Sequence, residues 1–307
     1  MEKLGKMKWK LTVKANWMRA KSRARASASM DDSGGLGCRP YSRRPAGGIG
    51  FTGPASRSMF GPMKIIGSYV SPYVRKVLVC MELKGLDYEV DPITPFFGND
   101  EFRRLSPLCR IPVLIDDGIV LTDSSVIAEY LDERFPQPPL LPREPKERAR
   151  ARWLEEFADS RLGDVFIWGL FYPKMVHPRV WGEPGDQQRI DNALATEIPS
   201  ALDYLEGELP ESGYLFGDIG LADIAIASFF RNGSYAGFNP DPSRWPKTAA
   251  FVALVLSHPA FTRLHNLEMI QVSTSIEGRR QALLDAGAKL TAETLGERQP
   301  RKGIMRL

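Results

Sequence analysis

Residues 63–84 read MKIIGSYVSPYVRKVLVCMELK and pass from a short β-branched run directly into a helical pattern. The apolar residues that mark one buried helical face are Val74, Val77, Leu78 and Met81. Pro72 suits the first helical turn, where its missing N–H leaves no hydrogen bond unmade. Ser71 precedes it as an N-cap, and Gly85 follows as a stop signal. The stretch therefore predicts a strand, a turn and a helix, with one hydroxyl at a helix start, where anions and thiolates are stabilised.

The length and composition are those of a globular protein with about two domains. The chain has 307 residues, of which 43% are hydrophobic and 25% are charged. No apolar run approaches the ~18 residues that mark a membrane-spanning helix, so we expect no membrane partner. The three cysteines are odd in number and widely spaced. They argue against a disulfide framework and favour a reducing compartment, which predicts a cytoplasmic protein.

The basic charge of the chain belongs to its first 62 residues. Residues 1–62 hold 13 Lys and Arg against 3 Asp and Glu, a net charge of +10, whereas the remainder holds 28 basic and 34 acidic residues, a net charge of −6. A nucleic-acid partner for the whole protein is therefore not expected. We interpret residues 1–62 as a disordered basic leader or as sequence upstream of a misassigned start, since Met63 directly precedes the first strand. An organelle transit peptide and a basic arm for nucleic acid or an anionic surface are the alternatives.

Residues 63–140 alternate between strand and helix patterns. We expect strands at 65–66, 88–90, 111–115 and 119–121, and helices at 72–84, at 99–105 and from 126 to about 135. An Asp-Gly turn at 117–118 joins the last two strands as a hairpin. Pro112 begins a strand, which is where a strand proline is permitted, often with a cis bond. This order of elements predicts a mixed four-strand sheet with helices packed on it.

A proline-rich linker ends this first domain. Five of the ten residues from 136 to 145 are proline, a density that leaves no regular element intact. Residues 146–275 then follow helical patterns and predict an all-helical C-terminal domain. Residues 276–307 are weakly patterned and predict a weakly ordered tail.

Three helices stand out in the second domain. The first covers 146–172, and Pro173 should end it. The second covers 187–209, with a kink at Pro199. The third opens within 217–226 and is apolar enough to lie at the centre of the domain.

Four motifs, in this order, carry a family resemblance. They are Ser71-Pro72-Tyr73-Val74-Arg75-Lys76-Val77, Arg110-Ile111-Pro112-Val113-Leu114, Thr122-Asp123-Ser124, and Gly217-Asp218 with Leu221-Ala222-Asp223-Ile224-Ala225. Over roughly residues 63–270 they resemble the active-site, cis-proline, γ-glutamyl-binding and helix-capping motifs of cytosolic glutathione S-transferases. The first motif is closest to the serine-type members of the plant tau class and to related bacterial proteins. The resemblance implies an α/β plus all-α fold, in which a thioredoxin-like domain precedes a helical one.

One position departs from the family pattern. The family usually has Ser or Thr at the N-cap of the buried helix, where this chain has Gly220. Glycine is an acceptable N-cap, within a few tenths of a kcal/mol of serine. We therefore expect slightly lower stability and an unchanged fold.

The resemblance implies that Ser71 stabilises the thiolate of glutathione, which then attacks an electrophile. Glutaredoxins, which share this fold, carry Cys-Pro-Tyr-Cys at the same turn. The chain has Ser71 and Val74 in place of the two cysteines, so dithiol–disulfide exchange on these side chains is excluded. A hydroxyl over a helix N-terminus lowers the pKa of a ligand thiol. The plainer interpretation is that Ser71 only caps the helix, and Tyr69 is the alternative donor, although its strand position favours buried packing.

The resemblance also implies a glutathione-binding set that consists of Arg110, Ile111, Pro112, Asp123 and Ser124. The backbone of Ile111 before Pro112 would pair with the cysteinyl part of the tripeptide. Asp123 suits the γ-glutamyl ammonium group, and Ser124 with the free N–H groups of a helix start suits the carboxylate. Arg110 could reach the glycyl carboxylate. The alternatives are that Asp123 only caps a helix and that Arg110 is a solvated surface residue.

Aromatic residues are candidates for the electrophile pocket. They are Tyr73, Trp168, Phe171 and Tyr172. The last three fall near the end of the first helix of the second domain. Aromatic residues at helical spacing are more often simple core, which is the alternative interpretation.

We expect glutathione as the co-substrate and no metal. The histidines His177, His258 and His265 are scattered without ligand spacing. The function implied by the resemblance is conjugation of glutathione to small hydrophobic electrophiles, as in detoxification, by a homodimer. The alternatives are a glutathione-dependent isomerase, dehalogenase or peroxidase, and a non-catalytic binding protein of the same fold. The presence of Ser71 together with Asp123-Ser124 argues against the last of these.

Overall fold

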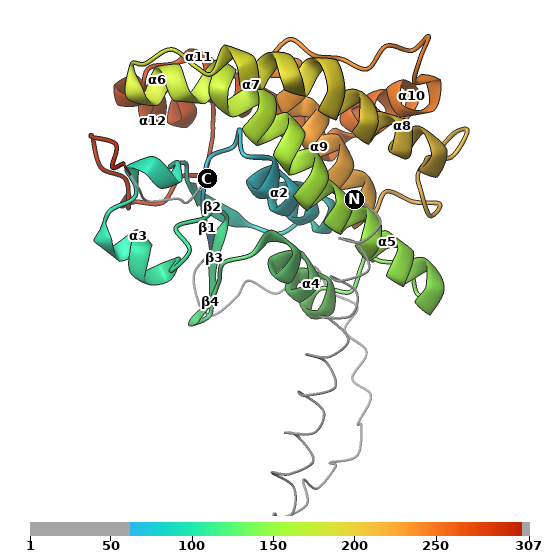
Figure 1. Ribbon diagram of the computed structural model, residues 1–307. Helices are drawn as coiled ribbons and strands as arrows, with labels where there is room; N and C mark the ends of the chain where they lie inside the picture. The colour runs from blue at the N-terminus through green and yellow to red at the C-terminus, as the bar shows by residue number, and fades with distance from the viewer. Residues whose placement is uncertain (1–61, 303–307) are drawn as a thin grey trace, which may run out of the picture. The chain divides into compact units, whose positions relative to one another are not determined.

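Four strands form one mixed sheet, shown in Figure 1. The computed structural model describes residues 62–302. The strands are β1 (Met63–Ile66), β2 (Tyr88–Asp91), β3 (Val113–Asp116) and β4 (Ile119–Leu121), in the order β2-β1-β3-β4. β1 runs parallel to β2 and antiparallel to β3, which pairs with β4 as a hairpin. The predicted mixed four-strand sheet and the fold class are confirmed.

Alternate residues of β1 and β3 face opposite sides of the sheet. The helices that cover the sheet are α2 (Pro72–Lys84), α4 (Ser124–Arg134) and α3 (Asp100–Leu105). Ile65 and Leu114, which are register partners, lie in the main hydrophobic core with α2 and α4. Ile66 and Val113 form a smaller cluster with Phe102 of α3. The period of two in these strands therefore places helices on both faces.

The start of α2 follows the sequence signals. Ser71 has extended backbone, and its Oγ accepts a hydrogen bond from the Val74 N–H at 3.4 Å. Gly85 ends the helix in the left-handed region, with φ of 63°. Gly67 precedes the turn, and a Cβ there would lie 2.5 Å from a methyl carbon of Val74. Only glycine allows the turn to approach the helix this closely.

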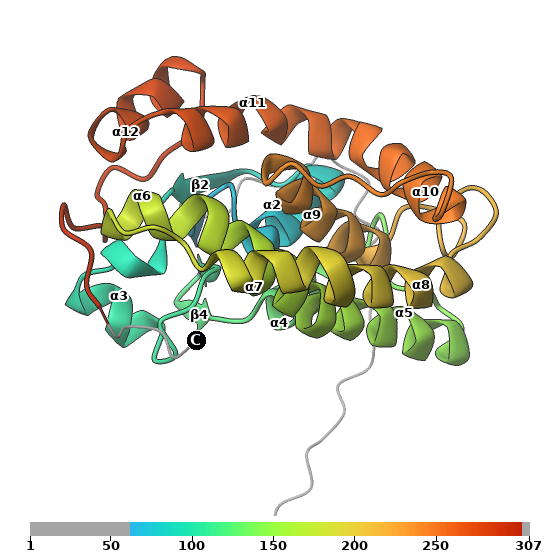
Figure 2. The same cartoon turned by 45° about the horizontal axis from the view of Figure 1, so that its top comes forward.

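Most of the remaining described chain is helical. Its elements are η1 (Pro95–Phe97) from the sheet region, then α5 (Pro145–Phe157), η2 (Ala158–Val176), α6 (His177–Trp181), α7 (Gln187–Asn192), η3 (Ala193–Glu197), α8 (Ile198–Glu208), α9 (Leu221–Tyr235), α10 (Pro246–Ser257), α11 (Pro259–Ser273) and α12 (Ile276–Asp285). The apolar helix α9 packs against α2, α5, η2 and α10. Figure 2 shows it among these helices, as the sequence predicts.

Pro173 does not end the first helix, which corrects the prediction. Helical structure continues from α5 through the π-helical η2 and into α6, so Pro173 lies inside it. The proline removes one backbone donor, but its ring is buried. Burial of apolar surface offsets the lost bond, and this term cannot be read from the local sequence. At Pro199 the helix changes instead from the π-helical η3 to α8.

The start of α9 explains the glycine at position 220. Asp223 accepts hydrogen bonds from the Gly220 N–H and the Leu215 N–H, both at 2.9 Å. A Cβ at residue 220 would lie 2.9 Å from the carbonyl oxygen of Leu140. That oxygen already accepts from the Leu221 N–H at 2.8 Å. Glycine is therefore required by the close approach of the linker, and is more than a weaker cap.

The prediction of a weakly ordered tail at 276–307 is wrong for residues 276–302. This part contains α12 and continues as an extended segment. In Figure 1 the segment, drawn red, descends from α12 beside α3. Residues 303–307 lie outside the described chain, as does the predicted leader except for residue 62.

Backbone pairing holds this C-terminal segment against the edge of β2. The Val90 N–H donates to the Lys289 carbonyl at 2.9 Å, and the Thr291 N–H donates to the Val90 carbonyl at 3.2 Å. The buried carboxylate of Asp91 accepts from the Leu295 N–H at 2.7 Å. An edge strand offers unpaired backbone groups to any segment that reaches it, whatever its side chains. The weak apolar pattern therefore gave no sign of this order.

No helix within residues 62–302 has the length and apolar content needed to cross a membrane.

Replacing Gly220 with serine should destabilise the protein, although serine is the better N-cap at an open position. The added Cβ must displace the Leu140 carbonyl, and we expect the free energy of unfolding in urea to fall by about 1–3 kcal/mol. The control is Gly207→Ala in α8, where nothing lies within 4 Å of a built Cβ. That variant should be unchanged or more stable by up to ~1 kcal/mol. A stabilised Gly220→Ser protein would contradict this account.

Candidate functional site

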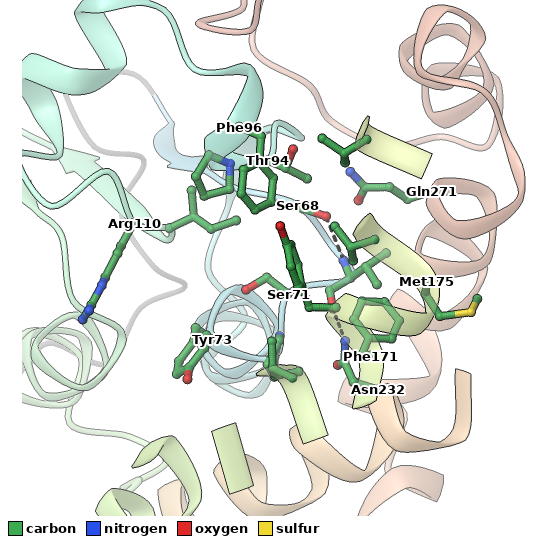
Figure 3. Close-up of a pocket in the computed structure, with 18 of the residues that line it drawn as sticks. Ser68, Ser71, Tyr73, Thr94, Phe96, Arg110, Phe171, Met175, Asn232 and Gln271 are labelled. Carbon is green, nitrogen blue, oxygen red and sulfur yellow. Dashed lines mark hydrogen bonds between the residues drawn. The ribbon is translucent and has the colours of Figure 1, made fainter. Parts of the chain in front are cut away.

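A cavity of about 1220 Å³ lies between the sheet and the helices that follow it. Figure 3 shows Ser71 in the middle of its labelled residues, with Phe96 above it, Tyr73 below it and Phe171 to its right. The sequence-predicted site residues that line the cavity are Ser71, Tyr73, Arg110, Ile111, Asp123, Ser124, Trp168, Phe171 and Tyr172. Pro112 is buried behind Ile111, joined to it by a cis peptide bond. The tertiary fold thus brings three separate motifs to one cavity.

Ser71 lines the cavity, whereas Tyr69 does not. The Ser71 side chain is half-buried at the N-terminus of α2. Because its oxygen accepts from Val74, its own proton remains available to a group in the cavity. Tyr69 is only 2% exposed and packs in the main core, where burial raises the pKa of its hydroxyl. The geometry therefore favours Ser71 over Tyr69 as a donor to a ligand.

The turn before Ser71 is fixed by side chains of the helical half. The Tyr69 N–H donates to Gln271 Oε1 at 2.7 Å. Asn232 Nδ2 donates to the Val70 carbonyl at 2.9 Å, drawn as a dashed line in Figure 3. Arg75 Nη1 in turn donates to Asn232 Oδ1 at 2.8 Å. Both Asn232 and Gln271 were missed by the sequence analysis, because they lie more than 150 residues from this turn.

A buried ion pair supports this arrangement. Arg75 Nε lies 2.6 Å from Glu268 Oε1, and the two side chains are 0% and 1% exposed. Burial alone would raise the pKa of Glu268, but the charge of Arg75 and hydrogen bonds from His265, Tyr235 and Arg75 lower it to about 2. The pair therefore remains ionised and joins α2 to α11.

Lys76 forms a second buried network at the wall of the cavity. Its Nζ lies 2.6 Å from Asp159 and 2.8 Å from Glu155, and donates to Ser125 Oγ at 3.2 Å. Burial would lower the pKa of Lys76, but the two carboxylates outweigh it and raise the pKa. This lysine remains charged and fixes η2 against α4 where Asp159 and Ser125 line the cavity.

The start of α4 presents polar groups to the same cavity. Asp123 Oδ1 accepts from the Ser125 and Val126 N–H groups at 2.9 and 3.1 Å. Its side chain is otherwise exposed, while Ser124 is only 3% exposed. The predicted N-cap role of Asp123 is therefore real, and it leaves one carboxylate oxygen for a ligand. In Figure 3 the exposed Arg110 extends away from Ser71.

Tyr73 contributes its ring to the cavity, and its hydroxyl is engaged elsewhere. The hydroxyl donates to the Asp159 carbonyl at 2.9 Å. The ring packs edge-on against Phe229 with centroids 5.3 Å apart. A Cβ at Gly163 would lie 2.6 Å from that hydroxyl, so the glycine makes room for it. Tyr73 is thus fixed in shape and is not a free donor.

An apolar wall faces Ser71. Trp168, Phe171 and Tyr172 of η2 line it, and Met175 continues it. Phe96 of η1 completes the wall, with its ring 5.8 Å from that of Tyr172. The Pro95-Phe96-Phe97 run, which the sequence analysis did not single out, is the local signal that could have drawn attention to Phe96.

The two cysteines within residues 62–302 do not line this cavity. Cys80 is buried, and burial raises the pKa of its thiol to about 12. Cys109 is half-buried and unpaired, and does not line the cavity. Within residues 62–302 no three His, Cys, Asp or Glu side chains are grouped so as to hold a metal ion.

Comparison with known proteins gives a consistent result. Residues 65–139 match the model of the glutathione S-transferase N-terminal domain. The uncharacterized GST-like protein YibF of Escherichia coli K12 is 32% identical over 208 residues, which cover 66% of this chain and 97% of that protein. Maleylacetoacetate isomerase of Pseudomonas aeruginosa is 30% identical, and the match covers 66% of this chain and 95% of the isomerase. A glutathione S-transferase structure from Rhodospirillum rubrum superposes with a TM-score of 0.61 at 30% identity, covering 66% and 91% of the two chains.

Replacing Lys76 with methionine should strongly destabilise the protein at neutral pH. Two buried carboxylates would lose their cation, and we expect the free energy of unfolding to fall by about 3–5 kcal/mol. Burial already raises the pKa of Asp159 in the wild type, and loss of the lysine, whose charge lowers that pKa, should raise it further. The loss of stability should therefore shrink as the pH is lowered and this carboxylate becomes protonated.

The control is Arg152→Met, which removes an exposed pair with Glu129 whose side chains are 50% and 37% exposed. Exposed pairs contribute little, so the change should stay below about 1 kcal/mol. Equal losses in the two variants, or a Lys76→Met loss that is the same at neutral and acidic pH, would show that the buried network is not what this lysine holds together.

Proposed function

This chain belongs to the glutathione S-transferase family, and from that premise we propose that it conjugates the thiolate of glutathione to small hydrophobic electrophiles. The observation that carries the proposal is the shared cavity. The Ser71 hydroxyl, the start of α4 at Asp123-Ser124 and the backbone of Ile111 all line it, opposite an apolar wall. The reaction requires a polar binding surface for the tripeptide beside an apolar surface for the electrophile. We call the polar surface, formed by Ser71, Ile111, Asp123 and Ser124, the cradle.

Ser71 activates the thiol. Its hydroxyl accepts from Val74 and donates to the glutathione sulfur, and the positive end of α2 lies beside it. Both interactions favour the thiolate over the thiol and so lower the thiol pKa towards neutrality. The nucleophile is thus supplied by the ligand. The protein supplies the Ser71 hydroxyl and the helix N-terminus that stabilise its ionised form.

The cradle holds the tripeptide by both ends and by its backbone. Ile111, before cis-Pro112, offers main-chain groups to the cysteinyl part. The free oxygen of Asp123 takes the γ-glutamyl ammonium, and Ser124 with the first N–H groups of α4 takes the carboxylate. Arg110 is exposed at the rim and can turn towards the glycyl carboxylate.

The electrophile lies against Trp168, Phe171 and Tyr172, with the Tyr73 ring at its side. Tyr73 and Phe171 are fixed by packing, so the surface keeps its shape when a ligand enters. Apolar surface of this kind binds through area removed from water. It thereby holds the electrophile near the sulfur, which raises the rate through proximity.

The same thiolate would serve an isomerase, since one relative bears that name. In that reaction glutathione is regenerated, whereas conjugation consumes it, and a thiol assay separates the two.

A homodimer in the cytoplasm is part of the same proposal, and light scattering of the purified protein tests its assembly.

Ser71→Ala should retain binding to immobilised glutathione and lose about a hundredfold or more in kcat/KM across a panel of electrophiles. Its activity should rise at higher pH, because the bound thiol keeps a higher pKa. The control is Tyr69→Phe, which removes only a buried hydroxyl outside the cavity and should keep wild-type kcat/KM. Full activity in Ser71→Ala would reduce Ser71 to a helix cap. Failure of the wild type to bind glutathione would exclude the proposed function.

A further inference from the structure

The cavity extends beyond the proposed glutathione cradle and the aromatic wall. Its volume of about 1220 Å³ exceeds the ~300–1,000 Å³ of ordinary ligand pockets. Its far end is formed by α6 and by the junction of α11 with α12. The residues that define this end are Arg179, Thr274, Ser275, Glu277 and Arg279. None of them has a place in the proposed function.

One helical face leads from the aromatic wall to this end. Phe171 and Met175 of η2 are followed by Arg179 of α6, each one turn further along the same continuous helix. All three line the cavity. A ligand that packs on the wall at Phe171 therefore has a guanidinium group two turns away.

The opposite side of this end is supplied by α12. Arg279 is half-buried and lines the cavity, and its Nη2 donates to the Thr274 carbonyl at 3.2 Å. Its Nε is buried and has no hydrogen-bond partner among the described residues. A buried guanidinium N–H without a partner costs free energy, which a bound acceptor would recover.

The charge at this end is not balanced. Within residues 62–302, neither Arg179 nor Arg279 lies within 4.0 Å of a carboxylate. Burial is the main cause that lowers the pKa of Arg279, and the positive charge of Arg179 lowers it further. The negative charge of the exposed Glu277 offsets this shift only in part. Apart from Glu277, the acidic residues that line the cavity are Asp123, Glu156, Asp159 and Asp164. The charges of Asp123, Asp159 and Asp164 all act on Tyr73, beside Ser71, and so belong to the thiol end.

The C-terminal segment fixes Arg279 in place. Leu283 of α12 is fully buried in the main core. Arg280, the next residue after Arg279, donates to the Thr291 carbonyl of the extended segment that pairs with β2. The helix that presents Arg279 is therefore held from both sides, and one hydrogen bond to the Thr274 carbonyl orients the guanidinium group.

We propose that Arg179 and Arg279 bind a carboxylate carried by the electrophile, which makes anionic, partly apolar electrophiles the preferred substrates. This inference rests on the proposed function, because it assigns the second substrate of the same reaction. Two guanidinium groups that converge on one space match the planar oxygens of a carboxylate. The apolar part of the substrate then lies on the wall, between the carboxylate and the thiolate at Ser71.

The glycyl carboxylate of glutathione is the other source of the same chemical group. The electrophile is favoured because the far end lies beyond the aromatic wall, whereas the cradle at Ser71 and Asp123 lies at the acidic end. Kinetics of the arginine variants separate the two sources. If the arginines bind the electrophile, their loss changes the KM for the electrophile. If they bind the glycyl carboxylate, their loss changes the KM for glutathione.

The test compares a chlorodinitrobenzoate with the corresponding neutral chlorodinitrobenzamide as electrophiles, using the full-length protein. In both reactions the glutathione sulfur bonds to the ring carbon, the carbon–chlorine bond breaks, chloride leaves and the thiol proton passes to solvent. We expect the wild type to favour the benzoate by about tenfold to a hundredfold in kcat/KM, the range for hydrogen bonds to a charged group.

Arg279→Gln and Arg179→Gln should each reduce that preference about tenfold, with the benzamide rate and the KM for glutathione unchanged. Arg179 is exposed and has no described partner, so its variant tests the proposal even if Arg279→Gln folds poorly. Arg263→Gln is the matched control, because it removes one exposed arginine charge from α11 outside the cavity. It should keep the wild-type preference.

Equal use of the two electrophiles by the wild type would overturn the proposal, as would a raised KM for glutathione in Arg279→Gln. If neither electrophile reacts, the proposed function fails for this class. The arginine site is then tested separately by calorimetry with dinitrobenzoate and dinitrobenzamide. Tighter binding of the benzoate by the wild type, lost in Arg179→Gln, supports the site, and equal binding of the two overturns it.

Discussion

The first turn of α2 is held in place by two charges that are almost fully removed from water. Arg75 and Lys76 are consecutive residues of the helix, so their side chains leave it in different directions. Arg75 bonds to Glu268 of α11 and Asn232 of α9, and Lys76 bonds to side chains of α4, α5 and η2. A buried charge is tolerated only when it is paired. The sheet half and the helical half must therefore meet in one arrangement around the helix that carries Ser71.

That constraint explains why the cavity has two chemically different sides. The polar side comes from short-range features of the sheet half, namely the turns before α2, β3 and α4. The apolar side comes from η2, which Lys76 fixes against α4 through Asp159 and Ser125. The C-terminal segment adds the third part, because its pairing with β2 places α12 over the far end.

The parts of the site that could be predicted from sequence are those with a local cause. Ser71 and Asp123 precede helices, and Pro112, which the sequence predicts to begin a strand, directly precedes β3 at Val113, so residue type and position define them within a few residues. Asn232, Gln271 and Arg279 have no such signal. Asn232 and Gln271 act through contacts with residues more than 150 positions away, and Arg279 lies on a helix whose apolar pattern is weak. The pattern of a single sequence carries no information about such contacts. Pro173 failed as a helix end for a related reason, because burial outweighed a local preference.

By itself the sequence determined the order of strands and helices, the N-caps of α2 and α4, and the replacement of both redox cysteines by Ser71 and Val74. These depend on hydrogen bonds and steric limits that act within a few residues. The tertiary structure decided which of the candidate side chains share a cavity, that Tyr69 is core while Ser71 faces a ligand, and that Gly220 is required by a carbonyl of the linker. It also decided that the C-terminal segment pairs with β2, and that α12, which precedes it, contributes Arg279 to the cavity. Burial and edge pairing depend on distances between remote segments, and only the folded chain sets those distances.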